Sequence, residues 1–119
     1  MLSQKMKRLI LQSDPARHLV IVVLLDSSKE TGKLSKIADP LARNRALDQA
    51  IWKLKQPVID AIEHYSDIGL RVVNDIEGSA TLVAAGPARA WKRLMDERSS
   101  LVSDPRLELV ANEPVWHIA

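Results

Sequence analysis

The feature that most constrains the fold is a run of apolar residues, Leu19–Leu25, in which β-branched side chains predominate. The run is far shorter than the roughly 20 apolar residues of a membrane-spanning helix. Neighbouring side chains of a strand point to opposite faces of a sheet. A segment that is apolar at every position therefore suits the middle of a sheet, or a strand covered on both faces. We expect a domain built around a sheet in which this segment is a central strand.

Three further segments have the signature of strands. Residues 70–77 and 80–85 flank Gly78-Ser79, a tight-turn signal, and are expected to form a hairpin. Residues 107–111 alternate apolar and polar side chains, which predicts the last strand.

Two segments have the apolar spacing of helices. The first begins at Asp39-Pro40, a capping residue followed by proline, and ends before Gly69. Pro57 lacks a backbone N–H, so we expect it to kink or split this helix near residues 53–56. The second helix begins at Gly86-Pro87 and ends before residues 103–105, and residues 29–40 between strand and helix are expected to be a loop. The apolar stripes of the two helices are Leu47, Ile51, Leu54, Val58 and Ile62 in the first, and Trp91, Leu94, Met95, Leu101 and Val102 in the second.

The order of these elements is β-α-β-β-α-β. It predicts an α+β fold of the ferredoxin-like type, a four-stranded antiparallel sheet with two helices on one face. The chain then divides into a basic N-terminal lead-in at residues 1–17, the ferredoxin-like domain at residues 18–111 and an extended C-terminal tail at residues 112–119.

No residue pattern indicates a catalytic centre, a metal site or a cofactor. The chain has no cysteine, and its histidines (His18, His64 and His117) lie in different predicted elements without ligand spacing. Three carboxylates, Asp60, Glu63 and Asp67, share the end of the first helix, where polar neighbours favour a solvated face over an acid–base pair. We therefore expect a protein that is not an enzyme and binds no cofactor.

Charge and composition argue against a polyanionic or membrane partner. The 17 basic and 15 acidic side chains leave a net charge of only +2. Ferredoxin-like sheets that bind RNA stack bases on aromatic side chains, and the four predicted strands contain none. The N-terminus lacks the apolar stretch of a secretory signal, so we expect a cytoplasmic protein that binds neither nucleic acid nor membrane.

The C-terminal tail is the most distinctive segment. Glu113-Pro114 leads into Val115, Trp116, His117, Ile118 and Ala119, and the proline favours an extended backbone. An extended segment with a large aromatic side chain suits binding in another protein's groove or at its sheet edge. The alternative is that Trp116 covers the core of its own domain, as aromatic side chains commonly do.

The chain resembles the inhibitor I9 family, which comprises propeptides of subtilisin-like serine proteases and their free-standing inhibitor relatives. The resemblance extends over residues 18–26 and 70–119. It is carried by the stretch Gly78–Leu82 (Gly-Ser-Ala-Thr-Leu), by Asp104-Pro105 after the second helix, by Leu109-Val110, by the tail, and by the opening strand Leu19–Leu25.

This resemblance implies a partner and a mode of binding. The family's tail lies in the substrate cleft of a subtilisin-like serine protease, while the sheet packs beside it. By position, Ala119, Ile118, His117 and Trp116 would occupy the first to fourth specificity subsites. Asn112 and Glu113 would cap helix N-termini of the enzyme. The implied site is thus Asn112, Glu113, Val115, Trp116, His117, Ile118 and Ala119.

Two other functions stay open at the level of sequence. The chain could be a ferredoxin-like interaction or ligand-sensing module that forms a homodimer through its sheet. A small dimeric enzyme with His64 or His117 as base would rest on fold analogy alone.

Overall fold

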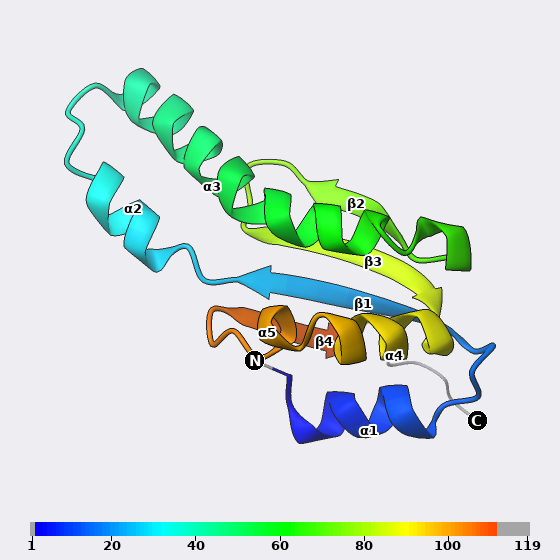
Figure 1. The fold of residues 1–119 in the computed structure, drawn as a ribbon. Coiled ribbons are helices and arrows are strands. Elements are labelled where there is room, and N and C mark those ends of the chain that lie inside the picture. The colour runs from blue at the N-terminus through cyan, green and yellow to red at the C-terminus, as the bar shows by residue number, and fades with distance from the viewer. Residues whose placement is uncertain (1, 112–119) are drawn as a thin grey trace, which may run out of the picture.

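Four strands and five α-helices make up the part of the chain that the computed structural model describes, residues 2–111 (Figure 1). In chain order they are α1 (Gln4–Gln12), β1 (His18–Leu25), α2 (Ser28–Leu34), α3 (Pro40–Glu63), the 3₁₀ turn η1 (Ser66–Ile68), β2 (Arg71–Ile76), β3 (Thr81–Pro87), α4 (Ala88–Glu97), α5 (Ser99–Val102) and β4 (Leu107–Ala111). All four predicted strands are present. The predicted α+β class with a four-stranded antiparallel sheet is confirmed.

The strands form one sheet in the order β2-β3-β1-β4, and every neighbouring pair is antiparallel. The apolar run Leu19–Leu25 lies in β1, which pairs with β3 on one side and β4 on the other, so its predicted central position is confirmed. The β2–β3 hairpin turns at Gly78, whose φ of 78° is accessible to glycine at little cost. The two edges of the sheet are β2 and β4.

Alternate side chains of β1 point to opposite faces of the sheet, and the two faces differ in burial. Leu19, Ile21 and Val23 are buried, whereas Val20 and Val22 are half-buried. The buried set belongs to a core cluster with residues of α1, α3, α4 and α5. We call this side of the sheet the inner face and the opposite side the outer face.

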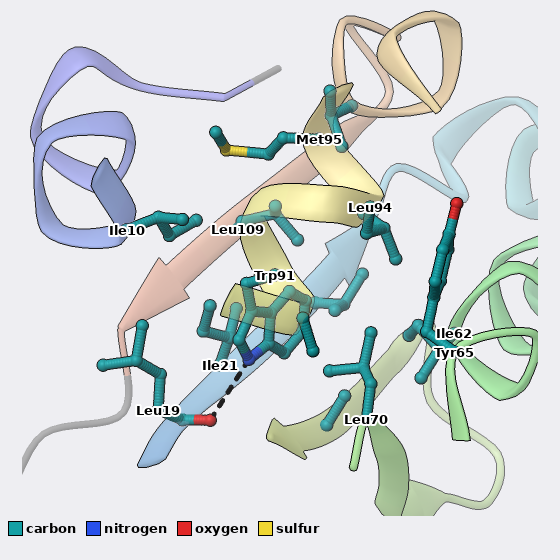
Figure 2. Packing of buried hydrophobic residues seen from close by; sticks show 14 of the residues in the cluster. Ile10, Leu19, Ile21, Ile62, Tyr65, Leu70, Trp91, Leu94, Met95 and Leu109 are labelled. Atoms are coloured by element: carbon teal, nitrogen blue, oxygen red, sulfur yellow. Dashed lines mark hydrogen bonds between the residues drawn. The ribbon is translucent and has the colours of Figure 1, made fainter. Parts of the chain in front are cut away.

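Trp91 of α4 is the largest side chain of the core and is only 1% exposed. Its indole N–H donates a hydrogen bond of 3.3 Å to the backbone carbonyl of Leu19, which satisfies the one polar atom of the ring (Figure 2). Ile21, Leu94 and Leu109 lie in the same cluster. The second predicted apolar stripe thus packs in the core beside the sheet, although Arg98 interrupts its helix between α4 and α5.

The predicted split of the first helix at Pro57 is wrong, because α3 is continuous over 24 residues with Pro57 inside it. Its start is as expected: the Asp39 carboxylate accepts the N–H of Leu41 at 3.3 Å and Pro40 follows the cap. An internal proline costs about 3 kcal/mol. Buried Ile51 and Val58 anchor the helix on both sides of the proline and offset that cost.

Two helices lie where the sequence predicted none. The loop expected at residues 29–40 is wrong in its first part, since α2 occupies Ser28–Leu34 without burying any side chain. Residues 1–17 also contain a helix, α1, and it contributes Met6 and Ile10 to the core. The Ser3 side chain starts α1 by accepting the N–H of Met6 at 3.1 Å. Of these two helices only α1 contributes to the core, in addition to α3 and the two parts of the second predicted helix, α4 and α5.

Candidate functional site

The predicted partner-binding residues follow β4 directly and lie outside the described residues. They are Asn112, Glu113, Val115, Trp116, His117, Ile118 and Ala119. The described chain ends at Ala111, the last residue of β4. Because β4 is an edge strand, the described chain ends at the border of the sheet rather than in its middle.

The outer face of the sheet is apolar across three strands. Val22 of β1 stands opposite Val83 of β3 and opposite Val110 of β4, so these three valines form a row. None of the three belongs to the core cluster, and Val110 is 40% exposed. A row of valines that lies outside the core cluster is a candidate surface for binding another protein.

A groove runs between α1 and the edge strand β4. It has a volume of about 510 Å³ and is lined by Met6 and Leu9 on the helix side and by Leu109, Val110 and Ala111 on the strand side. The groove therefore lies at the point where the described chain ends, and Val110 belongs both to it and to the outer-face row of valines.

The sequence interpretation did not single out a buried lysine, Lys55, as a candidate functional residue. Lys55 of α3 is 2% exposed, and its ammonium donates to Asp75 Oδ1 at 2.7 Å and to the Ile76 carbonyl at 2.8 Å. Together these bonds join the middle of α3 to the edge strand β2. The sequence held a signal, because Lys55 lies between Ile51 and Val58 at helical spacing on the buried stripe.

That ion pair borders a second pocket, which has a volume of about 250 Å³. Its lining includes Asp48 and Trp52 of α3, and Asp75 and Glu77 of the β2–β3 hairpin. Trp52 is 57% exposed, in contrast to the buried Trp91. The pocket is acidic and has an aromatic side chain on its rim.

The histidines do not form a site within the described residues. His18 is exposed at the start of β1, and His64 follows α3 with its ring edge against Tyr65, the centroids 5.0 Å apart. His117 lies outside residues 2–111. Across those residues no group of three or more histidine, aspartate or glutamate side chains could hold a metal ion.

The carboxylates at the end of the first predicted helix are all exposed. Asp60 accepts a hydrogen bond of 2.7 Å from the Gln56 amide, Glu63 ends α3, and Asp67 lies in η1. Their exposure agrees with the solvated face expected from the sequence.

A buried tyrosine shifts the titration of a neighbouring carboxylate. Tyr65 is 3% exposed and its hydroxyl donates to Glu97 Oε1 at 2.8 Å. Burial, followed by the hydrogen bond to Glu97, raises the pKa of Tyr65. The hydroxyl of Tyr65 in turn lowers the pKa of Glu97. The pair joins the end of α3 to α4 and serves the fold, because neither residue lines a described pocket.

Among the helices of residues 2–111, none combines the length and the apolar character that crossing a membrane requires. No protein family, curated protein or solved structure matches this chain.

Proposed function

We propose that this chain is a non-enzymatic inhibitor or propeptide-like folding partner of a subtilisin-like serine protease, which it binds through residues 112–119 and the outer face of its sheet. The observation that carries the proposal is the position of β4: this edge strand presents Val110 on the outer face and leads at Ala111 directly into the tail. In this arrangement the outer face of the sheet would contact the enzyme while the tail occupies the substrate cleft.

The arrangement of strands supports a ferredoxin-like fold, which is also that of the inhibitor I9 family. The order β2-β3-β1-β4 places β3 between β1 and β2, and β1 between β3 and β4. In the chain, α3 lies between β1 and β2, and α4 lies between β3 and β4. This connectivity supports the split β-α-β plan, with α1 and α2 as additions to it.

The tail supplies the chemistry of recognition in this proposal. A short extended segment binds in a cleft by backbone hydrogen bonds, and alternate side chains enter pockets that confer specificity. Trp116 would fill a large apolar subsite and Ala119 the subsite next to the catalytic serine. No bond of the inhibitor needs to be cleaved, because the tail lies in the cleft as a product does.

The test is inhibition of a set of purified subtilisin-like proteases by the full chain and by a variant that ends at Val115. We expect tight inhibition by the full chain and loss of at least about 100-fold in affinity on truncation, as for the removal of an aromatic anchor and its neighbours. Chymotrypsin, a serine protease of unrelated fold, is the control enzyme. Digestion of the full chain without inhibition would overturn the proposal.

The outer-face row of valines favours a second candidate, a module that forms a homodimer through its sheet. Val22, Val83 and Val110 would pair with the same residues of a second copy, as in an isologous interface. Sedimentation across a concentration series separates the two functions. A concentration-dependent mass that Val110→Lys abolishes, together with no effect on proteases, would support the dimer and contradict the inhibitor.

A further inference from the structure

The open edge of β4 presents backbone groups that the sheet does not pair. The pairing of β4 with β1 begins where the N–H of Asp26 donates to the Arg106 carbonyl at 2.8 Å, and its register continues without a shift. Hydrogen-bonded and non-hydrogen-bonded pairs alternate along an antiparallel ladder. Glu108 and Val110 therefore also bond to β1. The N–H and C=O of Leu109 point away from β1, to the open edge.

These two groups of Leu109 have no hydrogen-bond partner within residues 2–111. Leu109 is only 5% exposed, so water has little access to the residue. Buried backbone N–H and C=O groups of native proteins are nearly always hydrogen-bonded. The unpaired edge therefore indicates that a further group with both a donor and an acceptor lies against β4 in the native protein.

The groove beside this edge defines the chemistry of its occupant. Helix α1 forms the opposite wall with Met6 and Leu9. The backbone of an extended polypeptide carries donors and acceptors at the spacing of a strand, and it adds to a sheet edge as a further strand. A large apolar side chain of that strand suits the wall of α1. The occupant is thus an extended segment with a large apolar side chain.

The chain itself contains such a segment. Residues 112–119 follow Ala111, which lines the groove. Asn112 and Pro114 are residues that favour turns. The five residues that come next equal β4 in number and include Trp116. A segment tethered at the groove has an effective concentration on the order of millimolar, so it is favoured over a separate partner at micromolar concentration.

We propose that in the free protein residues 115–119 reverse direction after residues 112–114 and add to β4 as a fifth strand, with Trp116 against Met6 and Leu9 in the groove. The N–H and C=O of Leu109 then bond to the backbone of this strand. A regulatory consequence rests on the proposed function. The tail must leave the groove to enter the protease cleft, so the groove competes with the enzyme for Trp116.

The experiment is amide hydrogen exchange, measured by NMR, of the full chain and of a variant that ends at Pro114. We expect the Leu109 amide to exchange at least about tenfold more slowly in the full chain than in the variant. The Val110 amide bonds to β1 in both proteins and is the internal control. Equal rates for Leu109 in the two proteins would overturn the proposal. Protection that increases with protein concentration would also overturn it, because a second copy would then be the occupant.

Substitutions in the full chain locate the contact. Trp116→Ala is expected to raise the exchange rate of the Leu109 amide several-fold. Leu9→Glu places a charge in the wall of the groove and should have the same effect. Leu11→Glu is the matched control, because Leu11 lies on the same helix but is 48% exposed and does not line the groove. The indole signal of the buried Trp91 reports folding, and an unchanged Leu109 rate in folded Trp116→Ala would contradict the proposal.

Exchange and inhibition together separate this inference from the proposed function. A protected Leu109 amide without inhibition of any protease would support the contact in the groove and contradict the inhibitor. Inhibition by a chain whose Leu109 amide is unprotected would do the reverse. Where both hold, saturating protease should raise the Leu109 exchange rate to that of the variant that ends at Pro114.

Discussion

Lys55 Nζ lies 2.7 Å from Asp75 Oδ1 and joins the middle of α3 to the edge strand β2. The two partners differ in their access to water, since Lys55 is 2% and Asp75 is 40% exposed. Removing one partner therefore has a different consequence from removing the other.

Asp75→Ala is expected to destabilise the fold more than Lys55→Met. Without Asp75, the lysine charge stays buried with only the Ile76 carbonyl as partner, which costs about 2 kcal/mol. Methionine in place of Lys55 fills similar space, and the half-exposed Asp75 is then hydrated, so we expect a cost below about 1 kcal/mol. Urea denaturation of both variants measures the difference. A larger loss for Lys55→Met would contradict this account.

The Tyr65–Glu97 hydrogen bond predicts an acid-sensitive contribution to stability. The pKa of Glu97 is lowered from 4.5 in the folded state, so the unfolded chain binds the proton more readily as the pH falls. The contribution is present above pH 4.5 and is lost as the pH falls through the folded pKa. Tyr65→Phe removes the hydroxyl, the largest cause of the lowered pKa, and should weaken this dependence, while the charge of Arg93 continues to lower the pKa of Glu97.

The measurement is the urea midpoint of the native chain and of Tyr65→Phe from pH 7 to pH 3. We expect the variant to be less stable at pH 7, because it lacks the hydrogen bond to Glu97. The difference between the two proteins should shrink toward acid pH. A constant difference over the whole range would show that the bond to Glu97 is not responsible.

Helix α1 provides a matched pair of neighbouring apolar residues. Ile10 is 2% exposed and belongs to the core cluster, whereas Leu11 is 48% exposed. Ile10→Ala should cost about 2–4 kcal/mol, because it leaves a cavity among packed side chains. Leu11→Ala should change stability by less than about 0.5 kcal/mol. Equal effects of the two changes would mean that α1 does not pack on the domain.

The strands were predictable because their signals are local and agree with one another. The apolar run Leu19–Leu25 and the turn at Gly78 specify elements whatever their surroundings. The helix α1 was missed because Met6 stands between two lysines and the apolar residues that follow, Leu9–Leu11, make up only one turn, which is too short to show a stripe. Its stability comes from contacts made only in the folded chain.

The candidate sites depend more than the strands do on contacts between residues that are far apart in the sequence. A lysine within an apolar stripe is visible in the sequence, yet its partner Asp75 is 20 positions away. The acidic pocket also needs the hairpin turn beside α3, which no local pattern specifies. By contrast, the valines of the outer face follow from strand alternation once the register is known.

Two glycines in different settings give the last prediction. A Cβ added at Gly86 of β3 would lie 2.9 Å from the Leu70 Cα and 3.0 Å from the Gly69 carbonyl oxygen. Both are backbone atoms, which cannot move aside as a flexible side chain can. Gly86→Ala should therefore destabilise the fold by about 1–3 kcal/mol through overpacking.

Gly32→Ala is the matched control, because a Cβ at Gly32 meets nothing within 4 Å and the residue lies inside α2. Alanine is the better helix former, so this change should stabilise the protein by up to about 1 kcal/mol. Thermal unfolding of the two variants should show shifts of opposite sign. A destabilised Gly32→Ala would mean that α2 does not persist in solution, and a neutral Gly86→Ala would mean that β3 does not approach Leu70 closely.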